Sequence, residues 1–203
     1  MIIRRSLLIV ALLAGICGSQ ASPLIEQVPA NQKAQLAAGQ TVATSQKVAG
    51  YAWPKLILFR VVNAPPSMVY ELFGDYSAVP SYNHNVIAAK VIAVNDDGSK
   101  DVQYTVRAPI IQRTSYTVRN TYTQKGNTYK VSWVLLKSAL AKSSDGSLKL
   151  EPYGKNQTLM RYENLCVPIT TLFSSMQNQA LEDAKSTVND IAKEAERRQA
   201  ASQ

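Results

Sequence analysis

The fold is decided by residues 168–200, which read PITTLFSSMQNQALEDAKSTVNDIAKEAERRQA. This stretch predicts one long helix, from Thr171 to about Gln199, that extends about 43 Å at 1.5 Å per residue. Such a helix is not stable alone in water, so its apolar face must pack against another element. That face is formed by apolar residues that recur at every third or fourth position: Phe173, Met176, Ala180, Ala184, Val188, Ile191 and Ala195.

The sequence before Pro168 has the alternation of β-strands instead. A period of two is typical of strands with one buried and one solvated face. This alternation is found over residues 102–106, 116–122, 129–135 and 158–167. Residues 56–62 are a short run that is apolar except for Arg60, and they predict a strand that is buried on both faces.

Turn residues separate these strands. Gly and Asn residues predict turns at 95–98, 125–127 and 154–156. The Asp145-Gly146 pair predicts a further hairpin turn, and Leu148 and Leu150 follow it in another strand.

The segment after residue 62 predicts two short helices. Ser67 is an N-cap candidate for the first helix, which we expect to end at Gly74-Asp75. A second short turn runs to Pro80, and a strand over 86–94 follows it. The expected order is therefore a strand, two short helices, six more strands and the long helix.

This order resembles the START-like, helix-grip (SRPBCC) superfamily, which includes polyketide cyclases, coenzyme Q-binding proteins and lipid-transfer proteins. Residues 63–73 (NAPPSMVYELF) resemble the family's strand exit and first helix. Residues 75–82 (DYSAVPSY) are similar to its Asp-aromatic-x-x-aromatic-Pro segment, with Val79 in place of the second aromatic residue. Trp133 and residues 158–162 (TLMRY) are similar to the family's later strands, so that the resemblance covers about 61–194.

The resemblance implies an α+β helix-grip fold. In this fold a curved antiparallel sheet of about seven strands surrounds the long C-terminal helix, and two short helices follow the first core strand. It also implies a cavity between sheet and helix. From the residues themselves, the small side chains of Ala180 and Ala184 either allow close packing against the sheet or leave room for a ligand.

The aromatic composition favours the second of these alternatives. The chain has ten Tyr and three Phe, so many buried rings carry a hydroxyl group that needs a hydrogen-bond partner. We expect the cavity to be lined by Tyr82, Tyr104, Tyr116, Trp133, Met160, Tyr162, Phe173, Met176, Ala180 and Ala184.

The sequence identifies no catalytic residues, no cofactor and no metal site. One His and two distant Cys cannot supply the four ligands of a usual zinc site. A catalytic alternative would use His84 as a general base, with either Asp75 as its orienting carboxylate or a tyrosine hydroxyl as its partner.

Residues 1–21 have the pattern of a secretory signal peptide. Arg4 and Arg5 precede an apolar stretch over 7–16, and Ser19 and Ala21 are small residues at the positions that signal peptidase reads. We expect cleavage after Ala21 and a secreted, periplasmic protein. Of the 22 Lys and Arg, two lie in this segment, so 20 basic and 14 acidic side chains remain, a net charge of +6.

We expect four segments along the chain. They are the signal peptide (1–21), an N-terminal tail (22–50), the START-like domain (51–199) and a C-terminal tail (200–203). Within the N-terminal tail we expect a tail or short helix over 22–38 and an extra strand over 41–48. The scattered basic residues suit solubility better than nucleic-acid binding. The mature chain has no integral membrane segment in this interpretation, and at most transient contact with a membrane.

The function predicted from the sequence is binding or transport of an apolar small molecule or lipid, which is the expected partner. The first alternative is a cyclase- or aromatase-like enzyme on the same fold. The second is an interaction module of the cell envelope whose cavity is filled with side chains.

Overall fold

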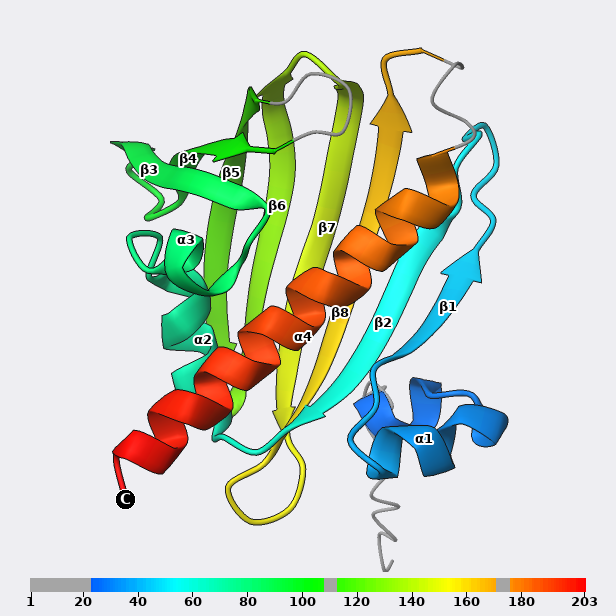
Figure 1. Ribbon diagram of the computed structural model, residues 1–203, viewed down its shortest axis with the longest axis vertical. Helices are drawn as coiled ribbons and strands as arrows, with labels where there is room; N and C mark the ends of the chain where they lie inside the picture. Colours follow the sequence, from blue (N-terminus) through cyan, green and yellow to red (C-terminus); the bar gives the residue numbers. More distant parts are fainter. Residues whose placement is uncertain (1–22, 108–112, 171–175) are drawn as a thin grey trace, which may run out of the picture.

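The computed structural model describes residues 23–107, 113–170 and 176–203. In this part of the chain, eight strands form one curved antiparallel sheet in the order β1-β2-β8-β7-β6-β5-β4-β3. The long helix α4 (Gln177–Ala201) crosses one face of the sheet (Figure 1). The predicted α+β helix-grip fold is confirmed. No helix within these ranges is both long and apolar enough to cross a bilayer.

The order of elements follows the prediction. The strands are β1 (Val42–Gln46), β2 (Lys55–Val62), β3 (Val86–Val94), β4 (Lys100–Val106), β5 (Thr114–Lys125), β6 (Thr128–Ser138), β7 (Ala141–Pro152) and β8 (Thr158–Pro168). The short helices are η1 (Leu24–Gln27), η2 (Ala30–Gln32), α1 (Lys33–Ala37), α2 (Pro66–Gly74) and α3 (Val79–Tyr82). From β2 onward this is a strand, two short helices, six strands and the long helix. The predicted start of that helix, Thr171, lies outside the described residues.

The expected extra strand over 41–48 is present as β1. It pairs antiparallel with β2, so it is the edge strand of the same sheet, beside the domain predicted to begin at residue 51. The segment before β1 forms the short helices η1, η2 and α1, which lie below β1 in Figure 1.

Two local predictions are wrong. No turn forms at Asp145-Gly146, because β7 continues through both residues and pairs with β6 and β8 on its two sides. Gly146 lies opposite Trp133, and a Cβ atom at residue 146 would overlap the Trp133 ring and the Glu163 carbonyl oxygen. In addition, α2 begins at Pro66 without a side-chain cap from Ser67. Proline suits the first turn of a helix, because no intrahelical bond is lost there.

The sheet is buried on both faces near β2. On the inner face, Leu58 and Val62 pack in a core that includes Val188 and Ile191 of α4. On the outer face, a second cluster covers the sheet. It contains Leu24, Val28, Leu36, Val42, Phe59, Val61 and Leu159. This arrangement confirms the prediction that residues 56–62 form a strand buried on both sides.

Candidate functional site

A cavity of about 970 Å³ lies between the sheet and the N-terminal half of α4. Strands β3 to β8, helix α3 and the inward face of α4 border it. Ligand pockets in proteins usually have volumes of about 300–1,000 Å³. The sequence left open whether the helix packs closely on the sheet or leaves room for a ligand. The structure therefore has the second arrangement.

The two halves of α4 meet the sheet differently. In the C-terminal half, Val188, Ala192 and Ala195 are fully buried against the inner core. In the N-terminal half, Ala180 and Thr187 border the cavity instead, so this half does not pack closely on the sheet.

Aromatic rings form the wall of the cavity on the sheet side. Tyr104 and Tyr116 stack with their ring centroids 5.3 Å apart. The Trp133 and Tyr162 centroids lie 5.2 Å apart, and Phe73 of α2 stacks on Trp133 at 6.1 Å. These offset contacts hold the rings in fixed positions, so they provide a rigid apolar surface.

Most of the predicted lining residues border this space. Tyr82, Tyr104, Tyr116, Trp133, Tyr162, Met176 and Ala180 line the cavity. Ala184 lines a smaller adjoining pocket of about 260 Å³, which Ala180 and Tyr162 also border. Phe173 lies outside the described residues. Whether any of these side chains binds a ligand stays a prediction.

Met160 is the exception, because it borders neither pocket. It precedes Tyr162 by two residues on the same face of β8, but it is fully buried in the inner core. The strand parity of Met160 was thus predicted correctly. Its depth was not, because parity does not tell where along the strand α4 closes onto the sheet.

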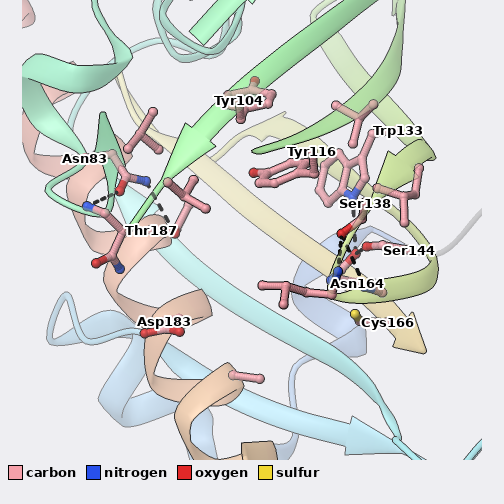
Figure 2. Close-up of a pocket in the computed structure, with 18 of the residues that line it drawn as sticks. Asn83, Tyr104, Tyr116, Trp133, Ser138, Ser144, Asn164, Cys166, Asp183 and Thr187 are labelled. Atoms are coloured by element: carbon pink, nitrogen blue, oxygen red, sulfur yellow. Dashed lines mark hydrogen bonds between the residues drawn. The ribbon is translucent and has the colours of Figure 1, made fainter. Parts of the chain in front are cut away.

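The polar part of the lining was not predicted from the sequence. Figure 2 shows polar side chains in two groups on opposite sides of the pocket. The polar part of the lining includes Asn83, Asn120, Ser138, Ser144, Asn164, Asp183 and Thr187. Strand parity alone was not a sufficient signal, although Asn120 and Asn164 share the inward parity of Val118 and Tyr162 on β5 and β8.

The first polar group is centred on Asn164. Its Oδ1 atom accepts hydrogen bonds from Trp133 Nε1, at 3.2 Å, and from Ser144 Oγ, at 3.0 Å (Figure 2). In the second group, Asn83 Nδ2 donates to Thr187 Oγ1 at 3.5 Å and so connects the end of α3 to α4.

A separate pair of hydroxyl groups lies beside the cavity. The hydroxyls of Tyr76 and Tyr122 are hydrogen-bonded to each other, and Asn120 Nδ2 donates to the Tyr76 hydroxyl at 3.0 Å. This contact uses one of the two N–H groups of Asn120 within the protein.

The cavity wall is largely uncharged. Burial raises the pKa of Tyr116 to about 12 and also raises the pKa of Tyr82, Tyr104 and Tyr162. Burial likewise raises the pKa of the Cys166 thiol, which therefore stays protonated at neutral pH. Among the described residues that line the cavity, the side chains with a formal charge are Arg107 and Asp183.

The catalytic pair considered from the sequence is not formed. His84 Nδ1 lies 3.5 Å from Asp190 Oδ2 on α4, whereas Asp75 accepts hydrogen bonds from Ser77 and Arg198. The His84 side chain is 67% exposed, and it is not among the described residues that line the cavity. Asp75 was chosen for its proximity in sequence, but the chain after α3 brings His84 to α4 instead.

Known proteins are similar to this chain in structure and not in sequence. No protein-family model matches the sequence, and no curated protein matches it. The STAR-related lipid transfer protein of Xanthomonas axonopodis superposes with a TM-score of 0.67 at 13% identity, over 76% of this chain and 93% of that one. The Zhui aromatase/cyclase of Streptomyces sp. R1128 has a TM-score of 0.62 at 14% identity, over 71% and 94% of the two chains.

A eukaryotic structure is similar over a longer part of the chain. Human STARD10 superposes with a TM-score of 0.61 at 17% identity, over 85% of this chain and 84% of that one. At sequence identities this low, structural similarity shows a shared fold but not a shared activity. The chain therefore has the START-like helix-grip fold that residues 61–194 resemble.

Proposed function

We propose that this protein binds and carries an apolar small molecule or lipid in the cavity between the sheet and α4. The observation that carries the proposal is a cavity of about 970 Å³ with an aromatic wall in a fold that packs closely elsewhere. Each CH₂ group removed from water contributes about 0.8 kcal/mol, so that a modest acyl or prenyl chain gains useful affinity by burial alone.

Transport fits the site better than catalysis. Structures with this fold include both a lipid transfer protein and an aromatase/cyclase, so the fold permits either function. General acid–base catalysis needs a titratable group within hydrogen-bond reach of the substrate. The sole histidine is directed to Asp190 and is not among the described residues that line the cavity. Asp183 is the carboxylate among the described lining residues, and its Oδ1 already accepts a hydrogen bond from Gln179 on the same helix.

We further propose that the carrier acts outside the cytoplasm. The pattern of residues 1–21 supports export, and a carrier that loads its ligand from a membrane needs only transient contact with it. Amino-terminal sequencing of the protein from the periplasmic fraction of its native host tests this part. The expected first residue is Ser22, and a protein that keeps Met1 in the cytoplasm contradicts export.

Binding of an apolar dye tests the carrier proposal directly. We expect Nile red to bind the purified, delipidated protein with one molecule per chain and with the blue-shifted emission of an apolar site. Organic extraction of the undelipidated protein is expected to release an apolar compound in a stoichiometric amount. A protein that is empty as purified and also leaves Nile red fluorescence unchanged contradicts the proposal.

A cavity-filling variant identifies where the dye binds. Ala180 borders the cavity, so Ala180→Trp is expected to weaken Nile red binding at least fivefold by occupying the space. Ala200→Trp places the same side chain at an exposed position of the same helix and is the matched control. Equal dye affinity in both variants would locate the dye outside the cavity.

A further inference from the structure

The amide of Asn164 has a fixed orientation at the edge of the cavity. Its Oδ1 accepts from Trp133 Nε1 at 3.2 Å and from Ser144 Oγ at 3.0 Å. An indole N–H can only donate, so the amide atom that faces it must be the oxygen. The other amide atom, Nδ2, therefore does not contact the indole nitrogen.

This Nδ2 group has no hydrogen-bond partner within the described residues, although Asn164 borders both the cavity and its adjoining pocket. Some polar side-chain atoms of the described residues are buried from solvent and have no hydrogen-bond partner, but Asn164 Nδ2 is not one of them. It is therefore an accessible donor in a mostly apolar wall. Asn120 differs, because one of the two N–H groups of its Nδ2 already donates to Tyr76.

The surroundings of Asn164 favour a neutral acceptor. Tyr162 and Cys166 follow the same face of β8 and line the cavity beside it, and burial keeps both protonated at neutral pH. Arg107 is bound to the carbonyl oxygen of His84, next to Asn83, which Figure 2 shows across the pocket from Asn164. A carboxylate beside Asn164 would lose its hydration without meeting a cation, which is costly.

We infer that Asn164 Nδ2 donates a hydrogen bond to a neutral carbonyl oxygen of the bound molecule. The ligand is then an apolar compound that bears a ketone, quinone, ester or amide carbonyl. This inference rests on the proposed carrier function and specifies the ligand class of the same cavity. Binding aligns the carbonyl with Asn164 and leaves the hydrocarbon part against the aromatic wall.

Three naphthalenes of similar size test this inference. They are 2-acetylnaphthalene (a ketone), 2-isopropylnaphthalene (a hydrocarbon) and 2-naphthoate (a carboxylate), and equilibrium dialysis at pH 7 gives each dissociation constant. We expect the wild type to bind the ketone at least tenfold more tightly than the carboxylate. Relative to the hydrocarbon, the affinity for the ketone is expected to fall about tenfold in Asn164→Leu, because a site built to donate a hydrogen bond loses its donor.

Two further variants separate this donor from general effects. Asn164→Asp retains an oxygen acceptor for Trp133 and Ser144 but has no N–H. Like Asn164→Leu, it is expected to lose affinity for the ketone relative to the hydrocarbon. Asn63→Leu makes the same substitution at an exposed residue that bonds Glu196 outside the cavity, and it should retain the preference. If Asn164→Leu fails to fold, Asn164→Asp and the wild-type comparison still decide the result.

The outcomes distinguish this inference from the proposed function. An unchanged ratio of ketone to hydrocarbon affinity in the Asn164 variants, with all proteins still binding Nile red, overturns the carbonyl assignment and leaves the carrier intact. Tighter binding of the carboxylate than of the ketone also overturns it. If neither the naphthalenes nor Nile red binds, the carrier proposal itself fails.

Discussion

At the scale of single residues, Trp133 connects the packing of the sheet to the cavity. Its ring lies over Gly146 on the neighbouring strand, where a Cβ atom at residue 146 would come within 2.6 Å of Cε2. Its indole nitrogen donates to Asn164 on β8. A glycine in the interior of a strand usually weakens the strand, but here it allows the close approach of an aromatic ring.

Replacing Gly146 tests this arrangement. Gly146→Ala is expected to lower the free energy of unfolding by about 3 kcal/mol, because the added methyl group overlaps both the Trp133 ring and a backbone carbonyl. Gly74→Ala is the control, since its Cβ would meet Tyr122 at an ordinary 3.7 Å. We expect a change of at most about 0.5 kcal/mol there. Urea unfolding of the two variants and the wild type gives both values, and equal midpoints would contradict the contact.

The aromatic part of the cavity could be predicted from the sequence, and the polar part could not. Strand parity assigned Tyr104, Trp133 and Tyr162 correctly because large rings on an alternating strand belong to the buried face. Asn164 has the same parity, but asparagine is mostly an exposed residue. Its inward position becomes evident only when the Trp133 indole is seen to donate to it.

At the scale of elements, charged side chains hold the C-terminal end of α4. Glu194 is buried, and it accepts hydrogen bonds from Arg197 at 2.7 Å and from Arg198 at 2.9 Å. Arg198 also donates to Asp75, just after α2, at 3.1 Å. These contacts fix the half of α4 that packs closely, so that the other half can border the cavity.

This cluster predicts a dependence of stability on pH. The hydrogen bonds from Arg197 and Arg198 lower the pKa of Glu194 from an ordinary 4.5 to about 2. Because the folded pKa is the lower one, the stabilisation is complete above the ordinary value and is lost as the pH falls toward 2. We expect Glu194→Gln to lower the free energy of unfolding by about 2 kcal/mol at pH 7.

The loss between about pH 5 and pH 2 should also be smaller in Glu194→Gln than in the wild type. Part of the slope is retained, because hydrogen bonds from Ser77 and Arg198 also lower the pKa of Asp75. The control is Glu182→Gln, because the Glu182 carboxylate pairs with Lys185 on the exposed side of the same helix. Thermal unfolding across this pH range gives the slopes, and parallel curves for wild type and Glu194→Gln would contradict the assignment.

The elements themselves were predictable because each has a period that a single sequence displays. The three-to-four spacing of the α4 stripe and the alternation in β4, β5, β6 and β8 predicted the types and order of these elements. The turn predicted at Asp145-Gly146 was wrong for a physical reason. A glycine is suited both to a turn and to a close contact within a sheet, and only the partner strand decides between them. The outer layer over 24–37 was predicted only as a tail or a short helix, because its helices are too short to show a period.

At the scale of the whole molecule, the sheet separates two hydrophobic clusters with different tasks. The inner cluster shares its face of the sheet with the cavity, and the outer cluster packs on the opposite face of β2 and β8. Changes in one cluster should therefore affect stability and binding differently from changes in the other.

Leu36→Ala and Ala180→Trp test this separation. Leu36 is fully buried in the outer cluster, so its truncation is expected to lower the free energy of unfolding by about 3 kcal/mol. The Nile red dissociation constant should stay within about twofold of the wild type, because no atom that borders the cavity is removed. Ala180→Trp is expected to do the opposite, weakening dye binding with little loss of stability. In the double variant both changes should add, since distant sites couple by no more than about 0.5 kcal/mol. Dye affinity that falls in Leu36→Ala to the extent seen in Ala180→Trp would mean that the outer layer shapes the cavity through the sheet.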